Sequence, residues 1–190
     1  MKQTHLFFPT PIVQDTIESD LEQYVMDLSS SDNGVKLSNK GGYQSKHFQK
    51  PEKEFQDLWE QIEAKLNVFH KNIAKLKGHV QIIDWWFNVN YKGSANRQHQ
   101  HSGSIHSGVY YIKTPENCGA LSISNPNQTL MWAWPGGIVK EHDYLNSGVI
   151  LMKPLKNLLY IFPSWVYHSV DANQSDEPRI SLSFNTGLIL

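Results

Sequence analysis

The hydrophobic pattern divides the chain into a helical first part and a strand-like second part. Residues 15–28 and residues 52–77 both carry apolar side chains at positions i, i+3, i+4 and i+7, which is the spacing of an amphipathic helix. Asp15 stands where the first helix needs an N-cap, and Gly78 where the second needs a C-cap. We expect the longer helix to cover one face of a sheet.

Residues 29–50 are polar and rich in Gly, Ser and Asn, so they predict a loop or a short ribbon. After Gly78 the period changes from that of a helix to that of a strand, beginning with the alternation around Trp86–Tyr91. Further strands are expected at 98–102, 107–113, 119–124, 148–153, 157–162 and 178–188. Because no helical pattern lies between these strands, they predict antiparallel sheets in a sandwich or barrel.

The length of 190 residues fits one domain. We expect residues 1–79 to form a helical and loop part that packs on a β core of residues 80–190. Residues 125–147 lack a period and contain Trp132 and Trp134. A connection of that length favours a lid or a binding loop over a plain linker. Its two tryptophans would form either a substrate surface or a small satellite core.

Composition narrows the class of protein. The formal net charge of -1 leaves no broad basic surface, so nucleic acid is not the expected partner. A single cysteine, Cys118, excludes an intrachain disulfide and fits a reducing, cytoplasmic compartment. We expect neither a signal peptide nor a membrane span. The oligomeric state is open, and an exposed aromatic face would permit a homodimer.

Three histidines have the spacing of a metal site. His99 and His101 are two positions apart in a predicted strand, so their rings project from the same face. His168 follows in the run Phe162-Pro163-Ser164-Trp165-Val166-Tyr167-His168. Imidazole suits Fe, Zn, Cu or Ni, and three ligands leave coordination positions open for substrate.

The last strand has an apolar face and a polar face, and Arg179 and Ser181 lie on the polar one. If this strand is central, the guanidinium is a buried charge that needs an anionic partner. A ligand carboxylate is the attractive partner, with Ser181 reaching the same group. The alternative is a structural ion pair within the protein.

Together these motifs resemble the iron(II)/2-oxoglutarate-dependent oxygenases. The runs Asn96-x-x-His99-x-His101, Ser107-Gly108-Val109-Tyr110-Tyr111, Phe162-Pro163-Ser164-Trp165-x-x-His168 and Arg179-x-Ser181-x-Ser183-Phe184-Asn185 carry the resemblance. It covers roughly residues 80–190, and the nearest branch is a small family found in bacteria and marine phages. The resemblance implies a double-stranded β-helix, or jelly-roll, core.

The same resemblance implies roles for individual residues. His99 and His168 would be iron ligands, Arg179 and Ser181 would bind the distal carboxylate of 2-oxoglutarate, and Asn96 would contact the same cosubstrate. With O2, 2-oxoglutarate would be decarboxylated to succinate while an unidentified substrate, a protein side chain or a small molecule, is hydroxylated. Aromatic residues are expected to form the shell around the substrate: Tyr110, Tyr111, Trp86, Trp165, Trp132 and Trp134.

His101 departs from the usual pattern of this superfamily. The usual ligand set is two histidines and one carboxylate, with the acid at the position of His101. We retain His101 as the third ligand, with Asp143 or Asp171 as acids that a loop could supply instead. The other histidines have no partners at a suitable spacing and are expected at the surface, with His106 near the mouth of the barrel: His5, His47, His70, His79, His106 and His142.

Two other interpretations remain open at this point. The cupins share the jelly roll, and Gly93, His99, His101 and His168 fit parts of their pattern. However, the cupin glutamate is missing after His101, and Arg179 would have no role. The other alternative is a jelly roll that binds metal but has lost its catalytic activity.

Overall fold

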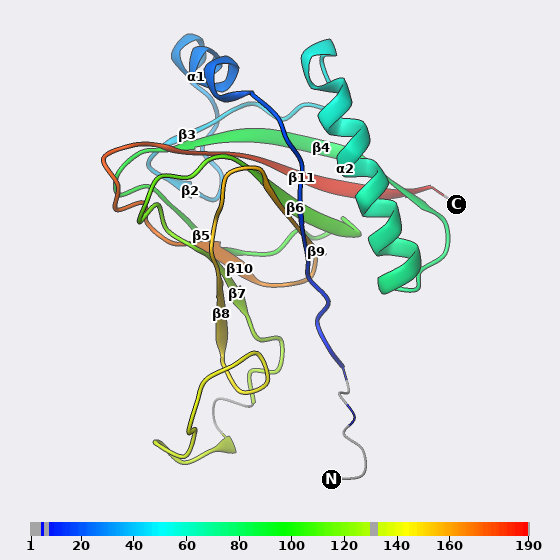
Figure 1. Ribbon diagram of the computed structural model, residues 1–190, viewed down its shortest axis with the longest axis vertical. Coiled ribbons are helices and arrows are strands. Elements are labelled where there is room, and N and C mark those ends of the chain that lie inside the picture. Colours follow the sequence, from blue (N-terminus) through cyan, green and yellow to red (C-terminus); the bar gives the residue numbers. More distant parts are fainter. Residues whose placement is uncertain (1–4, 6–7, 130–132, 190) are drawn as a thin grey trace.

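Two antiparallel β-sheets form the body of the protein in the computed structural model, which describes residues 5, 8–129 and 133–189 (Figure 1). The larger sheet has the strand order β1-β9-β6-β11-β4-β3, and the smaller has β2-β5-β10-β7-β8. The strands of the larger sheet are β1 (Val13–Thr16), β3 (Tyr43–Gln44), β4 (His79–Asn90), β6 (His106–Lys113), β9 (Leu158–Pro163) and β11 (Arg179–Ile189). Those of the smaller sheet are β2 (Asn39–Lys40), β5 (Ala95–His99), β7 (Leu121–Ser124), β8 (Val149–Met152) and β10 (His168–Val170).

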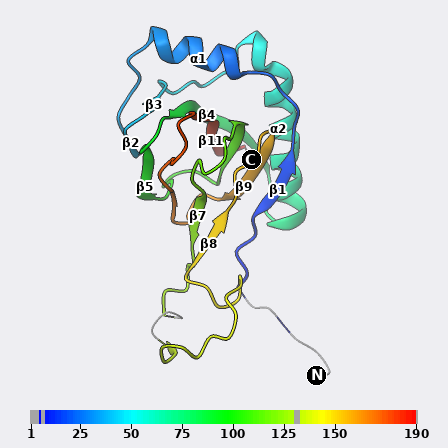
Figure 2. The same ribbon diagram turned by 60° about the vertical axis from the view of Figure 1, so that its left-hand side comes forward.

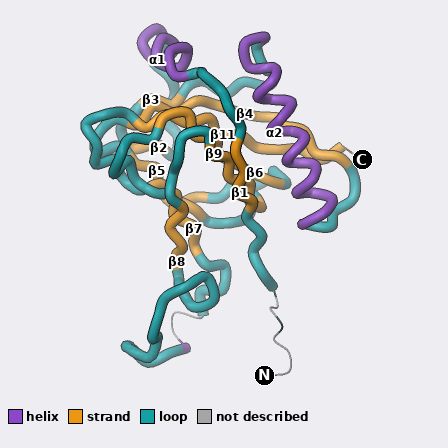
Figure 3. Tube along the Cα trace, in the orientation of Figure 1, coloured by secondary structure: helices purple, strands orange, loops and turns teal. Residues whose placement is uncertain are grey.

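Helices cover the outer face of the larger sheet (Figures 2 and 3). They are α1 (Glu22–Ser31), the short 3-10 turn η1 (Lys53–Phe55), α2 (Gln56–Val68) and its π-helical continuation η2 (Phe69–Ile73). The apolar faces of α1 and α2 meet Trp85 and Phe87 of β4 and Tyr110 of β6 in the main core. Burial of each such side chain contributes roughly 1.5–3 kcal/mol. The long helix therefore covers a sheet, as its pattern predicts.

A second, smaller core lies between the two sheets and includes Val109, Leu121, Phe162 and Val166. Gly108 on β6 allows the strand to pass close to its neighbours. A Cβ atom built there would lie 2.2 Å from Phe184 Cζ and 2.6 Å from the Tyr160 carbonyl oxygen. The mainly β, antiparallel fold expected from the sequence is confirmed, with every strand pair in the described ranges antiparallel.

The first helix begins later than the sequence predicts. Residues 13–16 form β1 on the edge of the larger sheet, where they pair with β9, and α1 begins only at Glu22. Asp15 is consequently a strand residue and not an N-cap. The backbone of this segment gains its hydrogen bonds from β9, a partner far away in the sequence, and that overrides the local helical spacing.

Two other segments depart from the expected boundaries. Residues 29–50, expected to form a loop or a short ribbon, contain the short strands β2 and β3, which join different sheets and do not pair with each other. The strand β10 was not predicted, because it is only three residues long and is held by pairing with β5 and β7. Among the described residues, no helix is long and apolar enough to cross a membrane.

Candidate functional site

Three histidines converge between the ends of β5 and β10. His99 on β5 and His168 on β10 are partners across the two antiparallel strands. His101 follows β5, and its backbone N–H donates to the Ser164 carbonyl at 3.0 Å. One nitrogen from each of the three rings lies within 4.8 Å of the others. The three predicted metal ligands are therefore brought together.

Backbone carbonyls orient two of these rings. His99 Nδ1–H donates to the Arg97 carbonyl at 2.7 Å, and His168 Nδ1–H donates to the Val166 carbonyl at 2.9 Å. A proton on Nδ1 leaves the lone pair of Nε2 as the available ligand. The donor set therefore fits a metal that accepts imidazole nitrogen.

Burial favours the neutral form of His101 and His168. Desolvation, followed by the nearby rings of His168, His99 and His47, lowers the pKa of His101 to about 3. Desolvation also lowers the pKa of His168 to about 4, with His99 adding to the shift and the Val166 carbonyl opposing it. Because metal binding requires an unprotonated imidazole, these rings need no proton loss at neutral pH before they can bind an ion.

A cavity runs from the three histidines between the two sheets. Apolar lining comes from Val109, Tyr111, Leu121 and Phe162. Polar lining comes from strands β4 and β11, whose alternate residues face inward: Asn88, Asn90, Arg179, Ser181 and Ser183. This confirms that the polar face of the last strand points into the space between the sheets.

Arg179 is fully buried at one side of this cavity, with 1% of its surface exposed. Its Nη1 donates to the carbonyls of Cys118, Gly119 and Asp171, whereas its Nη2 has no protein partner. No ion pair in the described part of the chain includes it. Burial lowers the pKa of the guanidinium, but arginine stays charged in proteins. Because Arg179 is a buried cation whose Nη2 has no hydrogen-bond partner among the described residues, it is better suited to bind an anionic ligand than to form a structural ion pair.

The other predicted cosubstrate residues line the same cavity. Ser181 is two positions from Arg179 on β11 and faces Asn88 across the strand pair. Asn96 on β5 lines the cavity as well, and its side-chain amide donates to Ser38 Oγ at 3.3 Å.

The residues of the predicted substrate shell line the cavity only in part. Trp86 lines the cavity, with its ring centroid 6.0 Å from that of His101. Tyr110 does not: it lies in the helix-side core, and its hydroxyl donates to the Ile17 carbonyl at 2.8 Å. Because successive strand residues face opposite ways, Tyr111 lines the cavity instead.

Trp165 and Trp134 do not line the cavity either. Trp165 is half exposed in the turn before β10, and Trp134 is exposed in the β7–β8 connection. This connection projects away from both sheets (Figure 2). None of its described residues lines the cavity, so a role as a lid or a binding loop stays a prediction. Trp132 lies outside the described residues.

Neither loop acid replaces His101. Asp143 accepts a hydrogen bond from the Leu145 backbone N–H at 2.7 Å and stays within its own loop. Asp171 accepts from Ser122 Oγ at 2.9 Å. No carboxylate belongs to the cluster of possible metal ligands among the described residues.

Two further histidines differ from the surface positions expected for them. His70 and His106 are buried and hydrogen-bonded to each other, Nδ1 to Nε2, at 3.0 Å on the helix side of the larger sheet. His106 is therefore a core residue and not a residue at the cavity mouth. Asn88 and Asn90 were not singled out as site residues, although their alternation with Phe87 and Val89 in a buried strand was a usable signal.

The fold and the site, with three grouped histidines and a buried arginine lining one cavity, are those expected of a jelly-roll oxygenase. Comparison with known proteins agrees. Residues 84–185, more than half of the chain, match the family described as "Putative 2OG-Fe(II) oxygenase". The chain belongs to this family of oxygenases that depend on iron(II) and 2-oxoglutarate. No curated protein sequence matches the chain.

Solved structures show the same fold. A prolyl-4-hydroxylase from Pseudomonas putida has a TM-score of 0.65 and 16% identity, covering 95% of this chain and 94% of that one. A viral collagen prolyl hydroxylase from Paramecium Bursaria Chlorella virus-1, in complex with 2-oxoglutarate, has a TM-score of 0.60 and 14% identity, covering 94% and 96%. HygX from Streptomyces hygroscopicus, with iron bound, has a TM-score of 0.60 and 10% identity, covering 95% and 83%. The predicted jelly-roll core is confirmed.

Proposed function

We propose that this chain is an iron(II)- and 2-oxoglutarate-dependent dioxygenase, a hydroxylase, with His99, His101 and His168 as its metal ligands. The observation that carries the proposal is the convergence of one nitrogen from each ring within 4.8 Å. The Nδ1 contacts of His99 and His168 support it, because they leave Nε2 free for the metal.

The third imidazole changes the charge of the centre. Three neutral histidines leave bound iron(II) with one more positive charge than two histidines and a carboxylate would. An anionic cosubstrate compensates part of that charge. We infer that the site relies on 2-oxoglutarate more strongly than a site with a carboxylate ligand does.

Arg179 is the proposed partner of the distal carboxylate of 2-oxoglutarate. Its unpaired Nη2 supports this role, because a planar guanidinium suits a carboxylate. Ser181 and Asn96 are proposed to contact the same cosubstrate. Gly119 holds the carbonyl cradle of Arg179 in shape: its φ is +84°, and a Cβ atom there would lie 2.3 Å from the Asp171 carbonyl oxygen.

When bound, iron(II) with 2-oxoglutarate and O2 supplies the oxidising chemistry that hydroxylates a C–H bond. The chain itself holds the ligands in place and excludes water. Val109, Leu121 and Phe162 form apolar walls of the cavity. Such walls limit the access of water and thereby reduce side reactions. A single-domain organisation and a cytoplasmic location are part of this proposal.

Anaerobic titration tests the proposed function. Iron(II) and 2-oxoglutarate added together should produce a weak visible charge-transfer band that neither produces alone. Under air, succinate should then be released. Metal binding without the band and without succinate would favour a metal-binding module that has lost its catalytic activity.

A further inference from the structure

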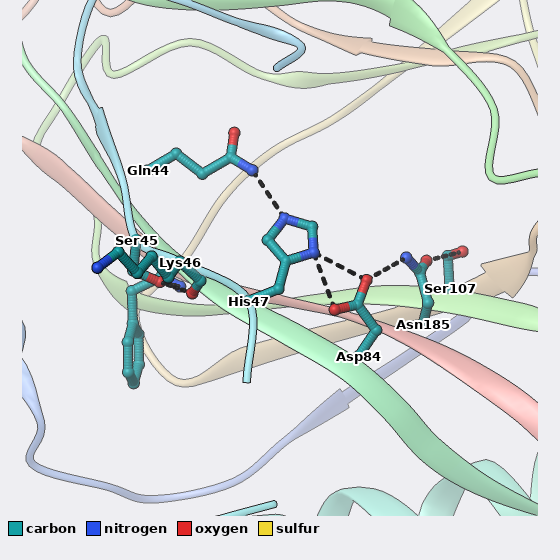
Figure 4. A network of polar contacts seen from close by, with 8 residues as sticks. Gln44, Ser45, Lys46, His47, Asp84, Ser107 and Asn185 are labelled. Carbon is teal, nitrogen blue, oxygen red and sulfur yellow. Dashed lines mark hydrogen bonds and ion pairs between the residues drawn. The ribbon is translucent and has the colours of Figure 1, made fainter. Parts of the chain in front are cut away.

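Four polar side chains form a strip across strands of the larger sheet (Figure 4). Ser107 Oγ donates to Asn185 Oδ1 at 2.8 Å, and Asn185 Nδ2 donates to Asp84 Oδ2 at 3.4 Å. His47 Nδ1–H donates to Asp84 Oδ1 at 2.8 Å. We name Ser107, Asn185, Asp84 and His47 the rim strip. Its hydrogen bonds all run toward one carboxylate, that of Asp84.

The rim strip borders the proposed metal centre. Asp84 and Trp86 are two positions apart on β4 and therefore share a face of the sheet. The His47 ring stacks on Trp86 with centroids 4.5 Å apart and planes 9° apart, and Trp86 in turn lies beside His101. Asp84 is thus connected to the predicted ligand His101 through two rings, those of His47 and Trp86.

The position of the rim strip in the sheet also fits a site for the substrate. On β11, Arg179 and Asn185 belong to the same inward-facing series, with Ser181 and Ser183 between them. Arg179 would hold one end of the cosubstrate at the inner end of this series. Asn185 and Asp84 lie at the other end, where the side chain of Asp84 keeps 29% of its surface exposed.

Among the described ion pairs, Asp84 lacks the lysine partner that other paired acids have. Asp15, Asp176 and Glu22 each pair with a lysine, at 2.5, 2.6 and 2.9 Å. The ion pairs of the described residues give Asp84 only His47. His47 donates through Nδ1, while its Nε2 accepts from Gln44 Nε2 at 3.2 Å. Asp84 is therefore paired with an imidazole and not with the ammonium group of a lysine.

We propose that the rim strip is the substrate-recognition edge of this enzyme and that it takes a substrate carrying an ammonium or guanidinium group. The inference rests on the function proposed above and adds the chemical class of the substrate. Asp84 accepts the N–H donors of the cation. His47 is a positioning residue, because it fixes the carboxylate and stacks on Trp86. Opposite charges at the two ends of the site, Arg179 and Asp84, keep the anionic cosubstrate and the cationic substrate apart.

Calorimetric titration tests the inference with pairs of probes, in each of which one member carries a cationic side chain and the other a neutral one. The protein is loaded with iron(II) and 2-oxoglutarate without O2. It is then titrated with N-acetyl-argininamide and with N-acetyl-citrullinamide, whose urea group replaces the guanidinium. A second pair is N-acetyl-lysinamide and N-acetyl-norleucinamide. We expect at least one cationic probe to bind about 10-fold or more tighter than its neutral partner, the range of a hydrogen bond to a charged group.

Asp84→Asn should abolish this preference, and Asp84→Glu should keep part of it. The matched control is Asp176→Asn, which removes an equally charged acid from an exposed ion pair with Lys92 and should leave the preference unchanged. A purely structural role for Asp84 would instead lower the melting temperature of Asp84→Asn without changing the ratio of affinities.

The charge-transfer band separates the two proposals, because Asp84→Asn should retain it. Its absence in the wild-type protein would count against the proposed function, whereas the probe preference is read from heat alone. If wild type binds charged and neutral probes equally, or if Asp84→Asn keeps the full preference, the rim strip does not select a cation and the inference is overturned.

Discussion

His99 and His168 face each other across the antiparallel pair β5 and β10, and their ring centroids are 4.4 Å apart. Each is tied through Nδ1 to a backbone carbonyl two residues before it. The pairing of two short strands therefore fixes the positions of two proposed metal ligands, and the hydrogen bonds to the backbone carbonyls fix their tautomers. His101 joins them through the hydrogen bond of its backbone N–H to Ser164.

Removal of the third imidazole tests the ligand set. His101→Ala should weaken iron(II) binding by more than roughly 10–100-fold, the cost of losing an outer-shell partner alone. His101→Asp should retain the ion, because a carboxylate restores the common ligand set. Competition with a chelator measures both affinities, and the exposed His142→Ala is the control. Unchanged affinity in His101→Ala would remove this residue from the ligand set.

Replacement of Arg179 should separate cosubstrate binding from metal binding. We expect Arg179→Ala to weaken 2-oxoglutarate binding by roughly 10–100-fold, since hydrogen bonds to a charged group contribute about 1.5–3 kcal/mol. Iron(II) affinity in the absence of 2-oxoglutarate should stay within about 2-fold of wild type, because Arg179 is not one of the grouped ligands. Anaerobic titrations of each component measure the two affinities. Loss of iron together with 2-oxoglutarate would contradict the role proposed for Arg179.

Acid should destabilise the metal-free protein through His106. Burial, assisted by His70, lowers the pKa of His106 from 6.5 to about 4. Between these two values the unfolded chain binds the proton and the folded chain does not, so stability is full above pH 6.5 and falls as the pH drops toward 4. The loss from this group reaches about 3 kcal/mol.

Urea unfolding at a series of pH values measures this loss. His106→Gln should be less stable than wild type at pH 7, because it disturbs a buried hydrogen bond with His70. However, its stability should fall less steeply between pH 6.5 and pH 4. Parallel curves for the two proteins would show that His106 is not the group that titrates.

Gly108→Ala tests the close packing of β6 against β9 and β11. The added methyl group would overlap Phe184 and the Tyr160 carbonyl, and overpacking of this kind costs about 1–3 kcal/mol or more. Thermal unfolding should show a clear loss of stability. Gly136→Ala is the matched control, because a Cβ atom there meets nothing within 4 Å. Equal melting temperatures for both variants would contradict the packing argument.

Local pattern was sufficient for much of the fold. The helix over residues 52–77 and the strand over 178–188 were predicted because their apolar faces repeat at the period of each element. The observed η1, α2 and η2 span residues 53–73, and β11 spans Arg179–Ile189. By contrast, β1 and β10 depend on partners far away in the sequence, and no local period reports such partners. Tyr110 was assigned to the cavity although strand alternation admits only one of Tyr110 and Tyr111.

The sequence by itself determined the ligand types: three histidines, an arginine on a polar strand face and a serine beside it. Side-chain chemistry and short-range spacing are local properties, so these could be read directly. Only the tertiary structure showed that neither Asp143 nor Asp171 lies in the histidine cluster. It also showed that Nη2 of Arg179 has no hydrogen-bond partner among the described residues and that His47 pairs with Asp84. Those facts depend on the packing of segments that are distant in the chain, where burial and strand register, and not spacing, set the distances.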